Sequence, residues 1–173
     1  MKGLTPLIGD NMESKLKAPS TVWSNWIHFL AFGFGSGVSP WAPGTMGTIV
    51  AIPIFLLIAW MPLLAYSIIV LILFTVGIWL CEITSKDLGV HDHSGIVWDE
   101  IVGYLITMFA VPAHLTWIVA GFILFRIFDI WKPWPIGLID KQVKGGLGIM
   151  LDDVLAGVFA LIVIHIMMFL MIV

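Results

Sequence analysis

Two pairs of adjacent acidic residues are the strongest sign of chemistry in this sequence. Asp99-Glu100 and Asp152-Asp153 each lie between a polar segment and an apolar run. They recur in one frame, since residues 95–102 read GIVWDEIV and residues 148–155 read GIMLDDVL. The alternative role for either pair is to favour the positive end of a helix dipole. Because the chain has 11 acidic residues in all, the repetition instead predicts two pseudo-repeated loop-helix units that bring four carboxylates to one site.

Carboxylates gathered at one site predict a bound divalent cation. Without one they repel each other and raise each other's pKa values. An all-oxygen ligand set selects magnesium, manganese or calcium rather than zinc, and we expect Mg²⁺. Adjacent helix residues point about 100° apart, so one acid of each pair should face the metal while its neighbour supports it or faces the substrate. The predicted catalytic and metal-binding acids are Asp99, Glu100, Asp152 and Asp153, with Asp129 as a further metal ligand.

A polar stripe runs through the apolar segment 125–133, which reads FRIFDIWKP. Arg126, Asp129 and Lys132 follow one another at three-residue intervals and therefore share a helix face. Arg126 and Asp129 could form a plain ion pair. Ionisable groups at membrane depth are nevertheless functional candidates. An arginine fork and a lysine point charge both suit phosphate, so Arg126 and Lys132 are predicted to bind a substrate phosphate.

Two glycine-rich segments precede apolar helices. Residues 34–48 read FGSGVSPWAPGTMGT, and residues 144–148 read KGGLG. Small residues let backbone N–H groups approach an anion at a helix N-terminus, whereas the alternative is a flexible loop closed by a capping residue. The candidate phosphate-binding residues in these segments are Ser36, Ser39, Thr45 and Lys144.

Other reactive residues have weaker patterns. His91-Asp92-His93 lacks a nearby third histidine or cysteine, which favours a loop anchor or a proton carrier over a zinc site. Cys81 is followed six positions later by Asp87, where a cysteine phosphatase loop has arginine. A covalent nucleophile is therefore not indicated, and metal-activated water is the expected route.

Composition places these residues in a membrane protein. The chain has 173 residues, 60% of them hydrophobic and 11% charged, with a mean hydropathy of +1.07. So small a domain cannot bury that much apolar surface internally. The net charge of −3 and the lack of a long basic run argue against nucleic acid. We expect a polar tail over residues 1–25 and one membrane-embedded domain over residues 26–173.

The elements that must position the acids are apolar helices of unequal length. Apolar blocks cover residues 48–60, 63–81, 101–125 and 154–173, and the third is interrupted at Pro112. If Pro62 and Pro112 both mark turns on the far side, all eight lysines and arginines fall on one side, as expected for the cytoplasm. A single kinked helix over Ile101–Phe125 is the alternative. The predicted fold is an all-α integral membrane helical bundle with short or interrupted helices.

The motifs together resemble those of the phosphatidylglycerophosphatase A family. The matching segments read FGSGVSPWAPGTMGT, GVHDHSGIVWDEIVG, FRIFDIWKPWPI and GGLGIMLDDVLAG, in order between Gly33 and Gly157. The resemblance implies a magnesium-dependent, multi-pass phosphatase of the bacterial cytoplasmic (inner) membrane, with its active site on the cytoplasmic side. It also implies the substrate, phosphatidylglycerol phosphate, and the products, phosphatidylglycerol and inorganic phosphate.

A different class of function is also compatible with paired acids in a membrane. A cation carrier or channel could bind a travelling ion between broken helices. The cationic residues separate the two hypotheses. Phosphate recognition needs Arg126, Lys132 and Lys144, whereas positive charges would obstruct a path for cations.

The topology can be tested by cysteine accessibility. In a protein with Cys81 replaced, a cysteine at Ala113 should react with an impermeant thiol reagent added from outside the cell, because the Pro112 turn is predicted to be periplasmic. Reaction of a cysteine at Gly89, with Ala113 protected, would reverse the predicted orientation.

Overall fold

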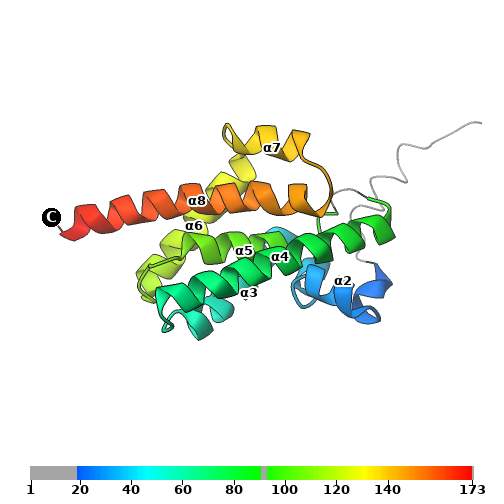
Figure 1. The fold of residues 1–173 in the computed structure, drawn as a ribbon, viewed down its shortest axis with the longest axis horizontal. Helices are drawn as coiled ribbons and strands as arrows, with labels where there is room; N and C mark the ends of the chain where they lie inside the picture. The colour runs from blue at the N-terminus through cyan, green and yellow to red at the C-terminus, as the bar shows by residue number, and fades with distance from the viewer. Residues whose placement is uncertain (1–18, 91–92, 173) are drawn as a thin grey trace, which may run out of the picture.

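The computed structural model describes residues 19–90 and 93–172, and these residues contain helices and no strand. The predicted all-α class is confirmed. Residues 1–18 of the predicted tail, together with His91 and Asp92, lie outside the described residues. In chain order the elements are η1 (Ser20–Trp23), α2 (Trp26–Ala31), η2 (Ser36–Val38), α3 (Pro43–Ile58), α4 (Leu63–Leu88), α5 (Trp98–Thr107), α6 (Leu115–Trp131), α7 (Ile136–Gln142) and α8 (Gly145–Ile172) (Figure 1).

Two long apolar helices, α4 and α8, run side by side along the molecule (Figure 1). Over Leu63–Leu88 and Gly145–Met171 they are long and apolar enough to cross a membrane. In the most apolar window of each helix, 22% of the residues are buried inside the protein. Most of their apolar side chains therefore need a partner other than the protein's own core.

Proline residues separate the shorter helices. Pro62 precedes α4, and Pro112 lies in the turn between α5 and α6. Proline cannot donate a backbone hydrogen bond and disfavours helical geometry in the residue before it. The apolar run 101–125 is thus a helical hairpin, and the alternative of a single kinked helix is wrong.

Helix α8 packs against α4, α5 and α6, and two glycines allow its backbone to approach α5 closely. A Cβ atom on Gly157 would lie 2.5 Å from the carbonyl oxygen of Gly103. A Cβ atom on Gly103 would lie 2.8 Å from the carbonyl oxygen of Asp153. Small residues at such contacts let two helix backbones pack directly in membrane proteins. This contact sets the distance between the helices that carry the acidic pairs.

One expectation about the acidic pairs is wrong. Asp99 and Glu100 lie in the first turn of α5, as predicted, but α8 has no acid in its first turn. It begins at Gly145, so Asp152 and Asp153 lie in its third turn. Residues 145–148, expected to be a loop, are helical, because Glu82 of α4 accepts a hydrogen bond from the Gly146 N–H at 2.5 Å and supports an earlier helix start. The two sequence repeats therefore occupy different positions in their helices.

The α5–α8 contact predicts that Gly157→Ala will destabilise the protein. The added methyl group meets backbone rather than a side chain that can move away, so unfolding should become easier by about 1–3 kcal/mol. Thermal unfolding in detergent would measure the change. Val119→Ile, which enlarges an exposed side chain on α6, is the matched control. Equal melting temperatures for both variants would contradict the proposed close contact.

Candidate active site

Helix α5 places the first acidic pair by fixing its own N-terminus. The Val97 N–H donates to the Ala31 carbonyl at 2.9 Å, and the Trp98 indole N–H donates to the Leu73 carbonyl at 3.0 Å. These bonds tie the start of α5 to α2 and α4. Asp99 and Glu100 therefore project from an anchored helix end, where the dipole favours negative charge.

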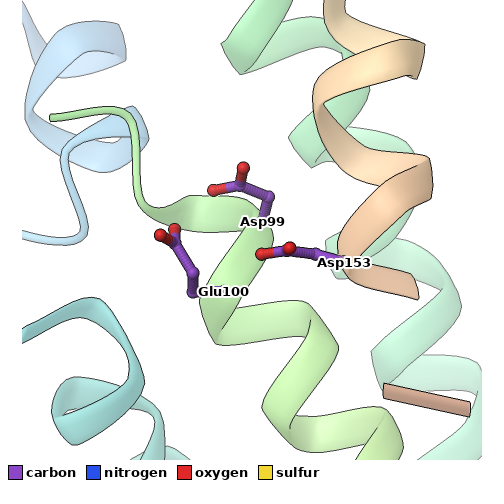
Figure 2. A group of neighbouring side chains, drawn as sticks. All are labelled: Asp99, Glu100 and Asp153. Carbon is purple, nitrogen blue, oxygen red and sulfur yellow. The ribbon is translucent and has the colours of Figure 1, made fainter. Parts of the chain in front are cut away.

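Helix α8 brings the second acidic pair to the same place. The carboxylate oxygens of Asp99, Glu100 and Asp153 come within 4.8 Å of one another. Figure 2 shows Asp99 and Glu100 projecting from the first turn of α5 and Asp153 reaching toward them from α8. Residues far apart in the sequence thus form one cluster, which we call the carboxylate triad. The prediction that acids from both pairs meet at one site agrees with this geometry.

The carboxylate triad has the properties of a cation site. Glu100 Oε2 and Asp153 Oδ2 are buried and have no hydrogen-bond partner among the described residues. A buried polar oxygen without a partner is costly. Hard oxygen ligands are what Mg²⁺ and related divalent cations prefer. The residues present therefore fit a divalent cation held by the triad.

The charge on Glu100 reflects this crowding. The pKa of the Glu100 carboxyl is raised to about 8, first by burial and then by the charge of the neighbouring Asp153, against the smaller opposing effects of Asp99 and Arg126. A cation bound among these oxygens would favour the ionised form of Glu100.

Arg126 lies beside the triad on α6. Its Nη1 atom is 2.5 Å from Asp129 Oδ2 and 3.8 Å from Glu100 Oε1. Gly44, in the first turn of α3, makes room for this arrangement, since a Cβ there would lie 2.1 Å from Glu100 Oε1. The ion pair with Asp129, one of the two alternatives from the sequence, is present, and it holds the guanidinium at the edge of the cluster.

Lys132 forms a second charged centre. Its ammonium nitrogen lies 2.5 Å from Asp152 Oδ2 and 2.9 Å from Asp140 Oδ1. Burial alone would lower the pKa of Lys132, but the hydrogen bonds and charges of Asp152 and Asp140 reverse the effect and raise it above its ordinary value. Lys132 is therefore a cation at neutral pH. Asp152 is engaged with this lysine and lies outside the triad.

A cavity of about 330 Å³ joins the triad to both cations. Its polar lining consists of Ser94, Asp99, Glu100, Arg126, Asp129, Lys132, Asp140, Asp152 and Asp153. All the predicted acids line this cavity, together with both predicted cations of α6. Six acids against two cations leave an excess of negative charge, so a phosphate could enter only with added positive charge.

The other predicted phosphate-binding residues do not line the cavity. Ser36 lies in η2, and its hydroxyl is buried. The Ser39 hydroxyl donates to the Trp41 carbonyl at 2.9 Å, which is a local turn contact. Thr45 lies within α3, and Lys144 is exposed just before α8. Their role in phosphate binding stays a prediction.

Sequence reasoning missed two acids that support the site. Asp140 on α7 contacts Lys132, and Glu82 on α4 accepts a hydrogen bond from the N-terminus of α8. Neither lies in an acidic pair, so no local pattern distinguishes them. His93, within the histidine cluster, accepts a hydrogen bond from the Gly95 N–H at Nδ1, which is consistent with a loop anchor.

Fold and site together define a class: a helical protein with bilayer-length apolar helices, whose polar cavity combines buried carboxylates with arginine and lysine. Within that class the chain belongs to the phosphatidylglycerophosphatase A family, whose profile matches residues 29–168.

Known relatives support this assignment. The chain is 49% identical over 158 residues to phosphatidylglycerophosphatase A of Escherichia coli, covering 91% of this chain and 89% of that protein. It is 46% identical over 142 residues to the Haemophilus influenzae protein of the same name, covering 81% and 87%. A Bacteroides thetaiotaomicron protein that carries the provisional name phosphatidylinositol-3-phosphatase is 44% identical over 140 residues, covering 76% and 87%. No solved structure is significantly similar to the chain.

The geometry predicts that the triad binds a divalent cation independently of any substrate. Mn²⁺ is a suitable probe because its electron paramagnetic resonance signal reports binding directly. Asp153→Asn should weaken Mn²⁺ binding by at least about tenfold, since it removes one of the charged ligands. Asp87→Asn is the matched control, because Asp87 is half exposed and pairs with His28 away from the cavity. Unchanged Mn²⁺ binding by Asp153→Asn would exclude the triad as the metal site.

Proposed function

We propose that this chain is a magnesium-dependent phosphatase that hydrolyses phosphatidylglycerol phosphate to phosphatidylglycerol and inorganic phosphate. The observation that carries the proposal is the carboxylate triad beside Arg126 and Lys132 in one cavity. The names of two close relatives supply the substrate. A phosphate monoester and a divalent cation together complement the charges that line the cavity.

Each group in the cavity has a distinct role in this proposal. Asp99, Glu100 and Asp153 would hold Mg²⁺, which, when bound, screens the phosphate charge and activates water for attack on phosphorus. Arg126, held by Asp129, is placed to bind phosphate oxygens. Lys132, held near Asp152, supplies a second positive charge. Asp129 and Asp152 then act mainly by positioning these cations.

Helix lengths support a site at the membrane surface. From Leu63 to Glu82 on α4, and from Asp153 to Met171 on α8, the rise is about 27–29 Å, close to the thickness of the hydrocarbon layer. If both helices end at the far boundary, Glu82 and Asp153 lie at the near one. The short helices α3, α5 and α6 would complete a membrane-embedded helical bundle around the cavity.

Charge placement supports the cytoplasmic side of the bacterial inner membrane. The two-hairpin arrangement would place four lysines on the same side of the membrane as the cavity, namely Lys86, Lys132, Lys141 and Lys144. This placement fits the positive-inside rule for the cytoplasmic side. Trp60, in the turn between α3 and α4, is 77% exposed and would mark the opposite interface. The phospholipid substrate would then present its phosphate from the inner leaflet.

A cation carrier or channel is the second candidate function. It would use the same buried carboxylates, and α4 and α8 could frame its path. The cavity disfavours it because Arg126 and Lys132 both line the space that a travelling cation would cross. Fixed positive charges raise the energy of a cation there and lower that of a phosphate.

Metal dependence is the first test of the proposed function. Purified protein in detergent should release inorganic phosphate from phosphatidylglycerol phosphate when Mg²⁺ is present. EDTA should abolish this release, and added Mg²⁺ should restore it, because the triad cannot complement a phosphate dianion without a cation. Phosphatidylinositol 3-phosphate is the comparison substrate, prompted by the name of the third relative. Full turnover in chelator would refute the metal-dependent reaction.

A further inference from the structure

Asp140 is the acidic residue of the cavity that lies in neither acidic pair nor the polar stripe of α6. We propose that Asp140 is a positioning residue, which holds the ammonium group of Lys132 where it binds the phosphate of the substrate. The inference rests on the proposed function, because it assigns Asp140 a part in recognising the same phosphate.

The contacts of Lys132 carry the argument. Its ammonium nitrogen is 2.9 Å from Asp140 on α7 and 2.5 Å from Asp152 on α8. A lysine ammonium has three N–H donors. Two of them are directed to these carboxylates, so one remains for a phosphate oxygen. The two acids thus fix the direction of the third donor.

Lys132 needs such support because of its stem. The flexible four-carbon stem lets a lysine ammonium occupy many positions, and holding the side chain in one of them costs conformational entropy. The backbone contributes as well: Lys132 ends α6 with φ +44°, in the left-handed region, and the chain turns toward α7. This turn returns Asp140, eight residues later, to the lysine side chain.

Asp152 alone would hold Lys132 less reliably. Asp152 is adjacent to Asp153 of the carboxylate triad, so a divalent cation held by the triad would attract the Asp152 carboxylate away from Lys132. Asp140 lies on a different helix, with a side chain that is 35% exposed. It would therefore keep a carboxylate beside Lys132 even if a bound cation attracted Asp152.

A double-mutant cycle tests whether Asp140 acts through Lys132. The variants are Asp140→Asn, Lys132→Ala and their combination, in the full chain purified in detergent. Calorimetry with inorganic phosphate in the presence of Mg²⁺ measures phosphate binding without requiring turnover. Steady-state hydrolysis of phosphatidylglycerol phosphate then gives kcat and KM separately. Asp87→Asn, an acid outside the cavity, is the control for loss of one negative charge.

We expect Asp140→Asn to weaken phosphate binding and raise KM by roughly fivefold, with little change in kcat, as for loss of one partly exposed charged contact. Lys132→Ala should weaken binding more. The double variant should match Lys132→Ala within about twofold, because residues that act as a unit are not additive. Asp140→Glu should restore part of the binding.

Other outcomes would overturn the inference. Additive losses in the double variant would show that Asp140 acts independently of Lys132. Normal phosphate binding by Asp140→Asn, together with a lowered melting temperature, would show that its role is to stabilise the fold. Wild-type protein that binds phosphate with the predicted coupling yet hydrolyses no lipid phosphate would refute the proposed function and leave the role of Asp140 intact.

Discussion

The repulsion among three clustered carboxylates, of which Asp153 is buried and Asp99 and Glu100 are partly buried, is the constraint on which the rest of this structure depends. Asp99, Glu100 and Asp153 place oxygens within 4.8 Å of one another, although burial disfavours their charged forms. The nearby cations do not fully compensate, because Arg126 is closest to Asp129 and Lys132 lies between two other acids. A divalent cation would resolve the imbalance. The glycine contact between α5 and α8, and the hydrogen bond that Glu82 accepts from the start of α8, hold the carboxylates together against this repulsion.

The same arrangement supports the proposed position of the site at a membrane surface. The apolar parts of α4 and α8 are long enough to cross the hydrocarbon layer. Asp153 of the carboxylate triad lies near the N-terminal end of α8. If both helices cross a bilayer, the acids would be tolerated near its surface, where water and headgroups are close, whereas they would be costly at the bilayer centre. In that arrangement a lipid phosphate would occupy the same depth as these groups. The proposed phosphatase could therefore meet its substrate without lifting it out of the bilayer.

Sequence patterns predict much of this organisation because they are local. Apolar runs and proline positions indicate α4, the α5–α6 hairpin and most of α8, and the paired acids indicate where the cavity forms. The start of α8 is missed because it depends on Glu82, which is 64 residues away in the chain from Gly146. The contact between Asp140 and Lys132 is missed for a similar reason, since it depends on a left-handed turn at Lys132. The sequence also does not indicate that Asp152 contacts Lys132 whereas Asp153 joins the carboxylate triad, because this difference depends on which neighbouring residues each side chain faces.

Anomalous X-ray diffraction from crystals grown with Mn²⁺ would test the central claim most directly. The manganese peak should lie at the carboxylate triad, about 2.2 Å from oxygens of Asp99, Glu100 and Asp153, as expected for a divalent cation with oxygen ligands. Lys132 should still contact Asp140 in that structure. A manganese peak bound elsewhere, or a triad that stays metal-free at saturating Mn²⁺, would contradict the account.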